Sequence, residues 1–175
     1  MAFIDELLAP APLDQLAGAP NSFTRFEGSW DLEWSRPDDD RAPSRLAGEL
    51  HFAAVLGGRA MQDVWKVPSV DDLPDDVRPY AFHGSTIRFF DDRLGAWRST
   101  WIEPLQGRVR TFIGRAVGEE MHLISTDGLP FLRWRFTEVA DDRFVWLGEY
   151  SDDEGRTWRL EERMVATRRS RGAHL

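Results

Sequence analysis

The sequence predicts an all-β fold: a single antiparallel up-and-down β-barrel of about ten strands with a short N-terminal helix. The first observation is that many stretches alternate apolar and polar residues. In residues 26–34, Phe, Gly, Trp, Leu and Trp share one face of a strand. The second is that short turns separate these stretches, with no segment long enough for a crossover helix. The third is that the chain has 8 Trp among 175 residues, which indicates an aromatic interior.

The N-terminal segment differs from the rest of the chain. Phe3, Ile4, Leu7 and Leu8 have helical spacing, and Pro10 follows as a stop signal. We therefore divide the chain into a helical lead-in (residues 1–22), a β-barrel (residues 23–169) and a C-terminal tail (residues 170–175). The lead-in has three possible places: across one end of the barrel, against a partner subunit, or loosely held.

The strands are predicted from alternating runs between turn signals. Gly57-Gly58 and Asp127-Gly128 are tight-turn signals. Residues 68–79, with four Asp and three Pro, form the longest irregular connection and a candidate lid. The predicted strands cover residues 24–35, 45–55, 59–67, 80–90, 96–103, 108–117, 120–125, 129–137, 143–150 and 157–167.

Composition narrows the function. The net charge of -8 disfavours nucleic-acid binding, and the chain has no Cys for disulfides, thiolate catalysis or Cys-based zinc sites. The start of the chain lacks a basic segment of the kind that opens a signal peptide, and no apolar run has membrane-spanning length. We therefore expect a cytoplasmic protein with no nucleic-acid or membrane partner, while a homodimer stays open.

One motif predicts a local turn. Residues 151–158 fit the pattern Ser-x-Asp-x-Gly-x-Thr-Trp, which resembles the Asp-box hairpin of sialidase-type propellers. The resemblance implies that the Asp bonds turn amides, that Gly155 takes a positive φ and that Trp158 anchors the hairpin. A propeller needs many such repeats, so this single copy predicts a hairpin and no glycosidase activity.

A second motif carries a family resemblance. Gly28-Ser29-Trp30 at the start of the first strand, followed by meander strands, resembles the calycin superfamily. The resemblance implies that Trp30 closes one end of the barrel under a basic residue, for which Arg163, Arg168 and Arg169 are alternatives. The chain also looks like an uncharacterised bacterial lipocalin-like family, whose recurring phrases correspond to residues 26–30, 58–65, 95–98 and 148–151. These resemblances imply a fold and no particular activity.

Strand parity predicts the residues of an internal ligand-binding site. Trp65, Trp97, Trp101 and Trp134 are expected to line a cavity. Asp63 and Arg115 are expected to face each other inside it as polar anchors. The alternatives are a buried ion pair that only fixes the barrel, or an outward position of either residue after a bulge.

Catalytic and metal-binding candidates are few. Asp63 and an inward Glu162 could move a proton, although an inward Glu more often meets an Arg. The histidines, at positions 51, 83, 122 and 174, form no metal-binding pair, so we predict no metal site and no cofactor. His83 is the one candidate axial ligand for haem, with a solvent-facing position favoured, and we expect His174 to lie in a disordered tail.

Three functions follow from this pattern. The first is binding of a small hydrophobic or aromatic molecule in the cavity. The second is a cofactor-independent isomerase, cyclase or hydratase that acts on an apolar substrate in the same cavity. The third is an interaction module whose barrel is filled by its own tryptophans, which the need of each indole N–H for a partner makes less favoured.

Overall fold

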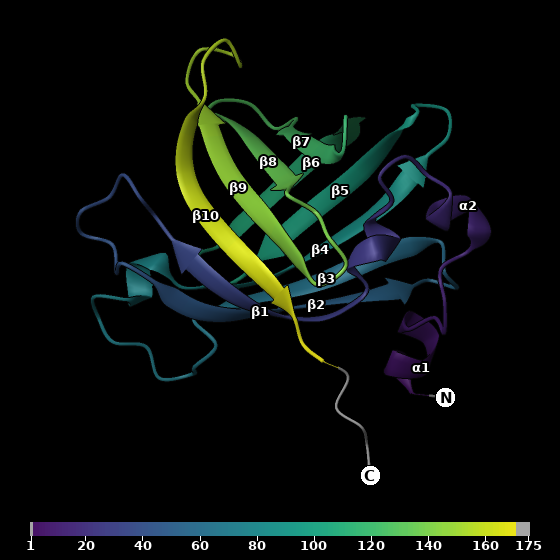
Figure 1. Cartoon of the computed structure of the whole chain (residues 1–175), viewed down its shortest axis with the longest axis horizontal. Helices are drawn as coiled ribbons and strands as arrows, with labels where there is room; N and C mark the ends of the chain where they lie inside the picture. Colours follow the sequence, from purple (N-terminus) through teal and green to yellow (C-terminus); the bar gives the residue numbers. More distant parts are fainter. Residues whose placement is uncertain (1, 171–175) are drawn as a thin grey trace.

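The computed structural model describes residues 2–170, and they form a closed ten-stranded antiparallel barrel (Figure 1). Each strand pairs with its neighbour in the chain, and the first strand closes the barrel against the last. The predicted fold class is therefore confirmed. The predicted C-terminal tail lies outside the described residues apart from Ser170, as does His174.

The strands lie close to their predicted positions. They are β1 (Gly28–Ser35), β2 (Leu46–Val55), β3 (Ala60–Val67), β4 (Phe82–Asp91), β5 (Ala96–Glu103), β6 (Arg108–Val117), β7 (Glu120–Ser125), β8 (Phe131–Thr137), β9 (Arg143–Ser151) and β10 (Arg159–Arg168). Four short helical segments complete the fold: α1 (Phe3–Leu7), α2 (Asp14–Ala17) and the 3-10 turns η1 (Phe23–Phe26) and η2 (Arg78–Tyr80).

The period of two explains the inner and outer faces of β1. Trp30, Leu32 and Trp34 are buried, whereas Asp31 and Glu33 between them are exposed. Successive side chains of a strand point to opposite faces, so this alternation places three large apolar groups inside the barrel.

The N-terminal segment covers one end of the barrel, which we call the closed end. Figure 1 shows α1 and α2 on the side opposite the long β1–β2 and β3–β4 loops. The chain is held there by the bridge of Leu8 with Val55 and by Asn21, whose side-chain amide donates to the carbonyl groups of Gly118 and Glu120 at 2.8 Å. From η1, Phe23 and Phe26 enter the barrel and have no exposed surface.

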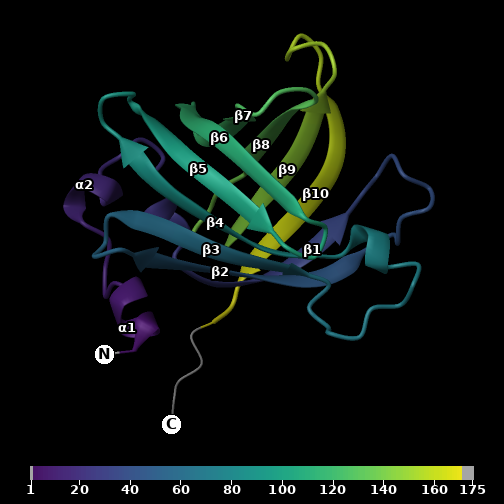
Figure 2. The same cartoon turned by 180° about the vertical axis from the view of Figure 1, so that it is seen from behind.

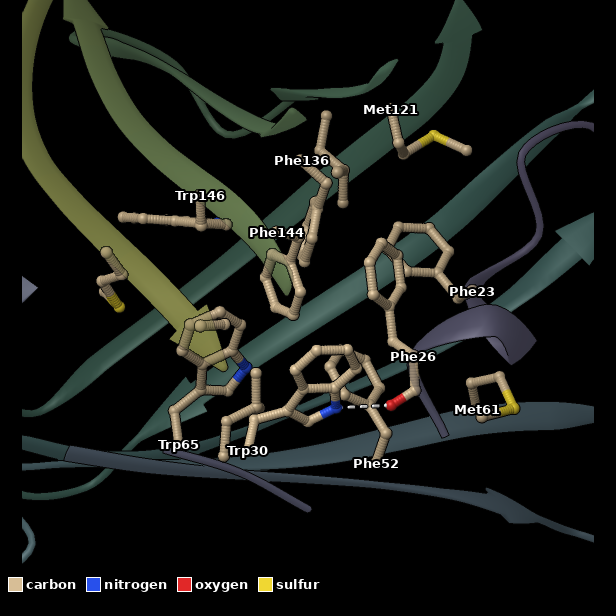
Figure 3. Close-up of a cluster of buried hydrophobic side chains, with 14 of the residues drawn as sticks. Phe23, Phe26, Trp30, Phe52, Met61, Trp65, Met121, Phe136, Phe144 and Trp146 are labelled. Carbon is tan, nitrogen blue, oxygen red and sulfur yellow. Dashed lines mark hydrogen bonds between the residues drawn. The ribbon is translucent and has the colours of Figure 1, made fainter. Parts of the chain in front are cut away.

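Trp30 completes the closed end. Its Nε1–H donates to the carbonyl of Phe26 at 2.7 Å, drawn as a dashed line in Figure 3. Of the three basic residues considered from sequence, Arg168 covers the Trp30 ring, with its guanidinium carbon 4.0 Å from the ring centroid. Arg168 also donates to the backbone carbonyl groups of Glu27 and Arg25 at 2.6 and 2.8 Å. It therefore joins the last strand to η1 and β1.

The other end carries the longer loops and is called the open end. The β3–β4 connection, residues 68–81, is the long irregular segment expected from sequence (Figure 2). Gln106 bonds the carbonyl groups of Arg78 and Ala81 at 3.1 Å, while the Tyr80 hydroxyl donates to Asp39 at 3.2 Å. Movement of this segment as a lid stays a prediction. Within residues 2–170, no helix is long and apolar enough to cross a membrane.

The β9–β10 hairpin has the geometry that its motif predicts. The Asp153 carboxylate accepts from the Thr157 backbone N–H at 2.8 Å and from the hydroxyl groups of Ser151 and Thr157 at 2.7 Å. These bonds lower the pKa of Asp153 well below its ordinary value. Gly155 has a φ of +84°, and the Trp158 ring packs 4.4 Å from the Arg133 guanidinium.

Candidate functional site

The barrel contains a cavity of about 460 Å³ that extends from the open end toward the middle of the core. This volume lies within the range of about 300–1,000 Å³ that is typical of small-molecule sites. Most of its wall is aromatic. The aromatic lining residues are Trp65, Phe82, Trp101, Trp134, Phe136, Trp146 and Tyr150.

Four of these residues form a continuous indole wall. Trp101 contacts Trp134, with ring centroids 5.8 Å apart, and Trp134 contacts Trp146 at 5.6 Å. Trp146 in turn lies 5.8 Å from Trp65 on the opposite side of the barrel. The four rings come from β5, β8, β9 and β3, so the wall exists only when the sheet has closed.

Two glycines make room for these rings. A Cβ atom at Gly84 would lie 2.5 Å from two atoms of the Trp101 ring, and one at Gly148 would lie 2.6 Å from the Trp146 ring. Non-bonded carbon atoms do not approach each other this closely, so a larger residue at either position would collide with the ring. The absence of a side chain at these two positions therefore leaves the space that the two rings occupy.

A buried ion pair lies behind the inner end of the cavity. The Arg88 guanidinium donates to Asp63 Oδ2 at 2.5 Å, and the backbone N–H of Thr86 donates to Asp63 Oδ1 at 2.9 Å. Arg88 also stacks over Phe23, with its guanidinium carbon 4.4 Å from the ring centroid. Burial lowers the pKa of Arg88, while Asp63 acts in the opposite direction. Arg88 and Thr86 line the cavity, whereas Asp63 lies behind them with both carboxylate oxygens bonded.

The structure corrects the predicted position of Arg115. Arg115 is exposed on the outer face of β6 opposite His122, so its expected pairing with Asp63 is wrong. The buried residues of β6 are Phe112 and Gly114, and Arg115 has the opposite parity. Gly114 lies opposite Trp97 on β5. Arg88 takes the place of Arg115 as the partner of Asp63.

Trp97 is also misplaced by the sequence analysis. It is buried, but it packs on Phe23 at the closed end, with ring centroids 4.9 Å apart and the rings nearly perpendicular. It does not line the cavity. Trp65, Trp101 and Trp134 do line it, as expected, and their contact with a ligand is a proposal taken up below.

Arg88 is the main residue that the sequence analysis missed. In β4 the outward residues Ile87 and Phe89 are apolar and the inward residues Thr86 and Arg88 are polar, which reverses the usual pattern. The available signal was Asp63 on the neighbouring strand: a carboxylate among inward aromatic residues needs a cation close by.

Glu162 faces the cavity, as its parity predicted. Burial raises the pKa of its carboxyl to about 6, and the charge of Glu161 adds to this effect. The indole N–H of Trp34 and the charges of Arg36 and Arg108 act in the opposite direction. Trp34 Nε1 nevertheless lies outside normal hydrogen-bond geometry with any acceptor among residues 2–170. Among residues 2–170, Glu162 therefore has no ion-pair partner.

A β-bulge lies next to Glu162 in β10. The pairing of β10 with β9 shifts between Leu160 and Glu162, so that Leu160 lies opposite Glu149 and Glu162 lies opposite Gly148. Glu149 is bonded to Arg133 at 2.6 Å on the outer face. Glu162 consequently lies beside the Gly148 gap.

The histidines lie away from the cavity. His83 is exposed on β4, as favoured from sequence, so it is not placed to bind haem inside the barrel. His51 bonds Ser29 at 2.9 Å, and His122 bonds Glu120 at 2.6 Å, both on the outer surface. Within the described part of the chain, no three His, Asp or Glu side chains gather in a way that could hold a metal ion.

Comparison with known proteins supports the fold. No family model and no curated protein sequence matches the chain. The barrel is similar to the S-type phycobiliprotein lyase CPES from Guillardia theta, with a TM-score of 0.54 and 11% identity over 85% of this chain and 90% of that one. A redesigned β-barrel, mFAP0 bound to DFHBI, has a TM-score of 0.44 and 12% identity over 82% of this chain and 99% of that one. The similarity to the lyase structure supports the closed antiparallel barrel fold.

Proposed function

We propose that this protein binds a small hydrophobic or aromatic molecule inside the barrel. The observation that carries the proposal is the cavity of about 460 Å³ with Trp65, Trp101, Trp134 and Trp146 on its walls. A site of this kind combines apolar walls with a few fixed polar groups. Here the polar groups are Arg88 and Thr86 at the inner end and Glu162 on the side.

The open space favours binding over a purely structural role. A barrel filled by its own side chains would pack to the density of a protein interior and would leave no void of ligand size. The closed end has that dense packing, with Phe26 within 5.1 Å of Phe136 and 4.8 Å of Phe144 between ring centroids. The open half of the barrel keeps the cavity.

Titration with a neutral hydrophobic probe tests the proposal. N-phenylnaphthylamine should gain fluorescence as it enters the cavity and should quench the tryptophans. Trp134→Leu should weaken binding about tenfold or more, the effect expected when a central aromatic contact is truncated. The matched control is Trp97→Leu, which removes an indole ring from the closed end. The melting temperature of this variant should fall, while its affinity for the probe should be retained.

Two outcomes would count against binding. One is the absence of saturable probe binding to the wild-type protein. The other is an equal loss of probe affinity in the Trp134→Leu and Trp97→Leu variants, because Trp134 lines the cavity and Trp97 does not.

A second function is favoured by Glu162. An unpaired carboxyl with a pKa near 6 in an apolar cavity is suited to proton transfer at neutral pH. We propose, as the alternative to simple binding, a cofactor-independent isomerase, cyclase or hydratase in which Glu162 moves the proton. Asp63 is less suited, because Arg88 and the Thr86 amide occupy both of its oxygens.

Product analysis separates the two functions. Ligands that saturate the site would be incubated with the protein and examined by mass spectrometry and NMR for isomerised, cyclised or hydrated products. Glu162→Gln should abolish turnover while binding is retained. Recovery of every ligand unchanged leaves binding as the function.

Other expectations from sequence stay predictions. They are membership of a bacterial lipocalin-like family, a cytoplasmic location, and the absence of nucleic-acid and membrane partners, while a homodimer stays open. The contact of Arg168 with the Trp30 ring agrees with the closure that the calycin resemblance implies.

A further inference from the structure

We propose that the cavity selects apolar molecules that carry a protonated amine, with the ammonium group bound to the Glu162 carboxylate and the apolar body held against the tryptophan wall. This inference rests on the proposed binding function and specifies the chemistry of the ligand.

The first argument is that the carboxyl groups around the cavity are satisfied by the protein, with Glu162 as the exception. Glu162 has no ion-pair partner among residues 2–170 and keeps partial exposure to the cavity. The others have partners as follows: Glu103 accepts from the backbone N–H groups of Leu105 and Gln106, Glu149 from Arg133, Asp152 from Arg159, and Glu161 from Arg36. The carboxylate of Glu162 is therefore available to a ligand.

The second argument concerns the positive groups. Arg88 is paired with Asp63, and Arg36 with Glu161. Arg110 lies 3.6 Å from Asp127. Arg108 is exposed at the open end and acts on Glu162 without forming an ion pair with it. Arg108 lines the cavity, and Arg88 keeps two N–H groups without an acceptor in the described part of the chain. Within residues 2–170, however, no cationic side chain forms an ion pair with Glu162, so the position beside this carboxylate favours a cationic ligand over an anionic one.

The third argument is the chemistry of the walls. The face of an indole ring is electronegative and attracts cations more strongly than the faces of Tyr or Phe. Four indoles line this cavity, in contact with one another from Trp101 through Trp134 and Trp146 to Trp65. Trp146 and Glu162 lie close together at Gly148. A Cβ atom placed on this glycine would be 2.6 Å from the Trp146 ring and 3.6 Å from Glu162 Cβ.

The energetic argument follows from burial. An ionised carboxylate in an apolar enclosure is poorly solvated, which is the cause of the raised pKa of Glu162. A bound ammonium ion neutralises this charge where water is scarce, whereas a neutral ligand leaves it uncompensated. A ligand carboxylate would add a second negative charge to the cavity.

Three ligands that share one ring system test the proposal by isothermal titration calorimetry at neutral pH. They are naphthylmethylamine, which is a cation, naphthylmethanol, which is neutral, and naphthylacetate, which is an anion. The amine should bind about tenfold or more tightly than the alcohol, the factor that a hydrogen bond to a charged group supplies. The acetate should bind most weakly.

Glu162→Gln should weaken the binding of the amine about tenfold or more and so remove its preference over the alcohol. This variant loses no ion pair, so it should fold. The matched control is Glu33→Gln, which removes the same charge from the outer face of β1, where Glu33 pairs with Arg45 at 3.0 Å. It should keep the preference.

The possible failures are distinguishable. Binding of all three ligands with equal affinity, or with the acetate tightest, overturns the amine proposal and leaves the binding function intact. A preference for the amine that persists in Glu162→Gln also overturns it. Absence of binding by all three, together with no binding of N-phenylnaphthylamine, refutes the binding function and this inference with it.

Discussion

Replacing Trp30 with alanine removes the side chain that joins η1, β1 and β10 at the closed end of the barrel. Trp30 has no exposed surface. Its ring lies 4.9 Å from the Phe144 ring centroid and 4.0 Å from the Arg168 guanidinium carbon, and its Nε1–H bonds the Phe26 carbonyl at 2.7 Å. The substitution therefore opens a cavity, leaves a buried carbonyl without its donor and separates Arg168 from its aromatic partner.

The expected loss is large for a single residue. Truncation of a buried aromatic residue to alanine costs about 3–5 kcal/mol. Because the hydrogen bond and the cation–π contact are lost together with the packing, we expect a value near 5 kcal/mol, the top of that range. For a domain of this size, such a loss lowers the melting temperature by about 10–20 °C.

Urea and thermal unfolding followed by far-ultraviolet circular dichroism measure this loss without relying on the removed tryptophan. Trp30→Phe is the matched control, because it keeps an aromatic ring and removes the indole N–H. It should cost about 1–2 kcal/mol, the effect of leaving one buried carbonyl unpaired. Melting of Trp30→Ala within a few degrees of the wild type, or equal losses in the two variants, would refute the closure role.

Two further predictions concern the charged groups of the interior. Arg88→Met should destabilise the protein by about 3–5 kcal/mol, because it leaves the buried carboxylate of Asp63 without its cation. In urea unfolding, the double variant Arg88→Met with Asp63→Asn should regain most of this stability. Additive losses from the two substitutions would contradict an energetic coupling between the two residues. The pKa of Glu162 is raised from 4.5 to about 6, so the folded state holds this proton more tightly than the unfolded state. The associated stability is present below pH 4.5 and is lost as the pH rises through about 6, at most about 2 kcal/mol. Glu162→Gln should flatten this part of the stability curve, and an unchanged slope between the two pH values would contradict the assignment.

The sequence by itself determined the class of fold and much of the strand order. The alternation in β1 leaves one choice of inner face, because Trp30, Leu32 and Trp34 are all on it and the two residues between them are acidic and exposed. The hairpin at Asp153 was equally determined, since its hydrogen bonds join residues within four positions in the chain. Local patterns suffice where the partners are local or where one face of a strand is clearly apolar.

The tertiary structure decided which polar residues meet inside the barrel. In β4 and β6 both faces carry apolar residues, since Ile87, Phe89 and Ile113 lie outside, so periodicity cannot choose the inner face. Only pairing with neighbouring strands does so, and it brings Arg88, rather than Arg115, to Asp63. The bulge beside Glu162 is likewise a property of the β9–β10 pair. The side chains of a strand alternate between its two faces, so a shift of one residue in the pairing register moves every side chain to the opposite face. The interactions that stabilise the correct register are made with residues distant in the sequence.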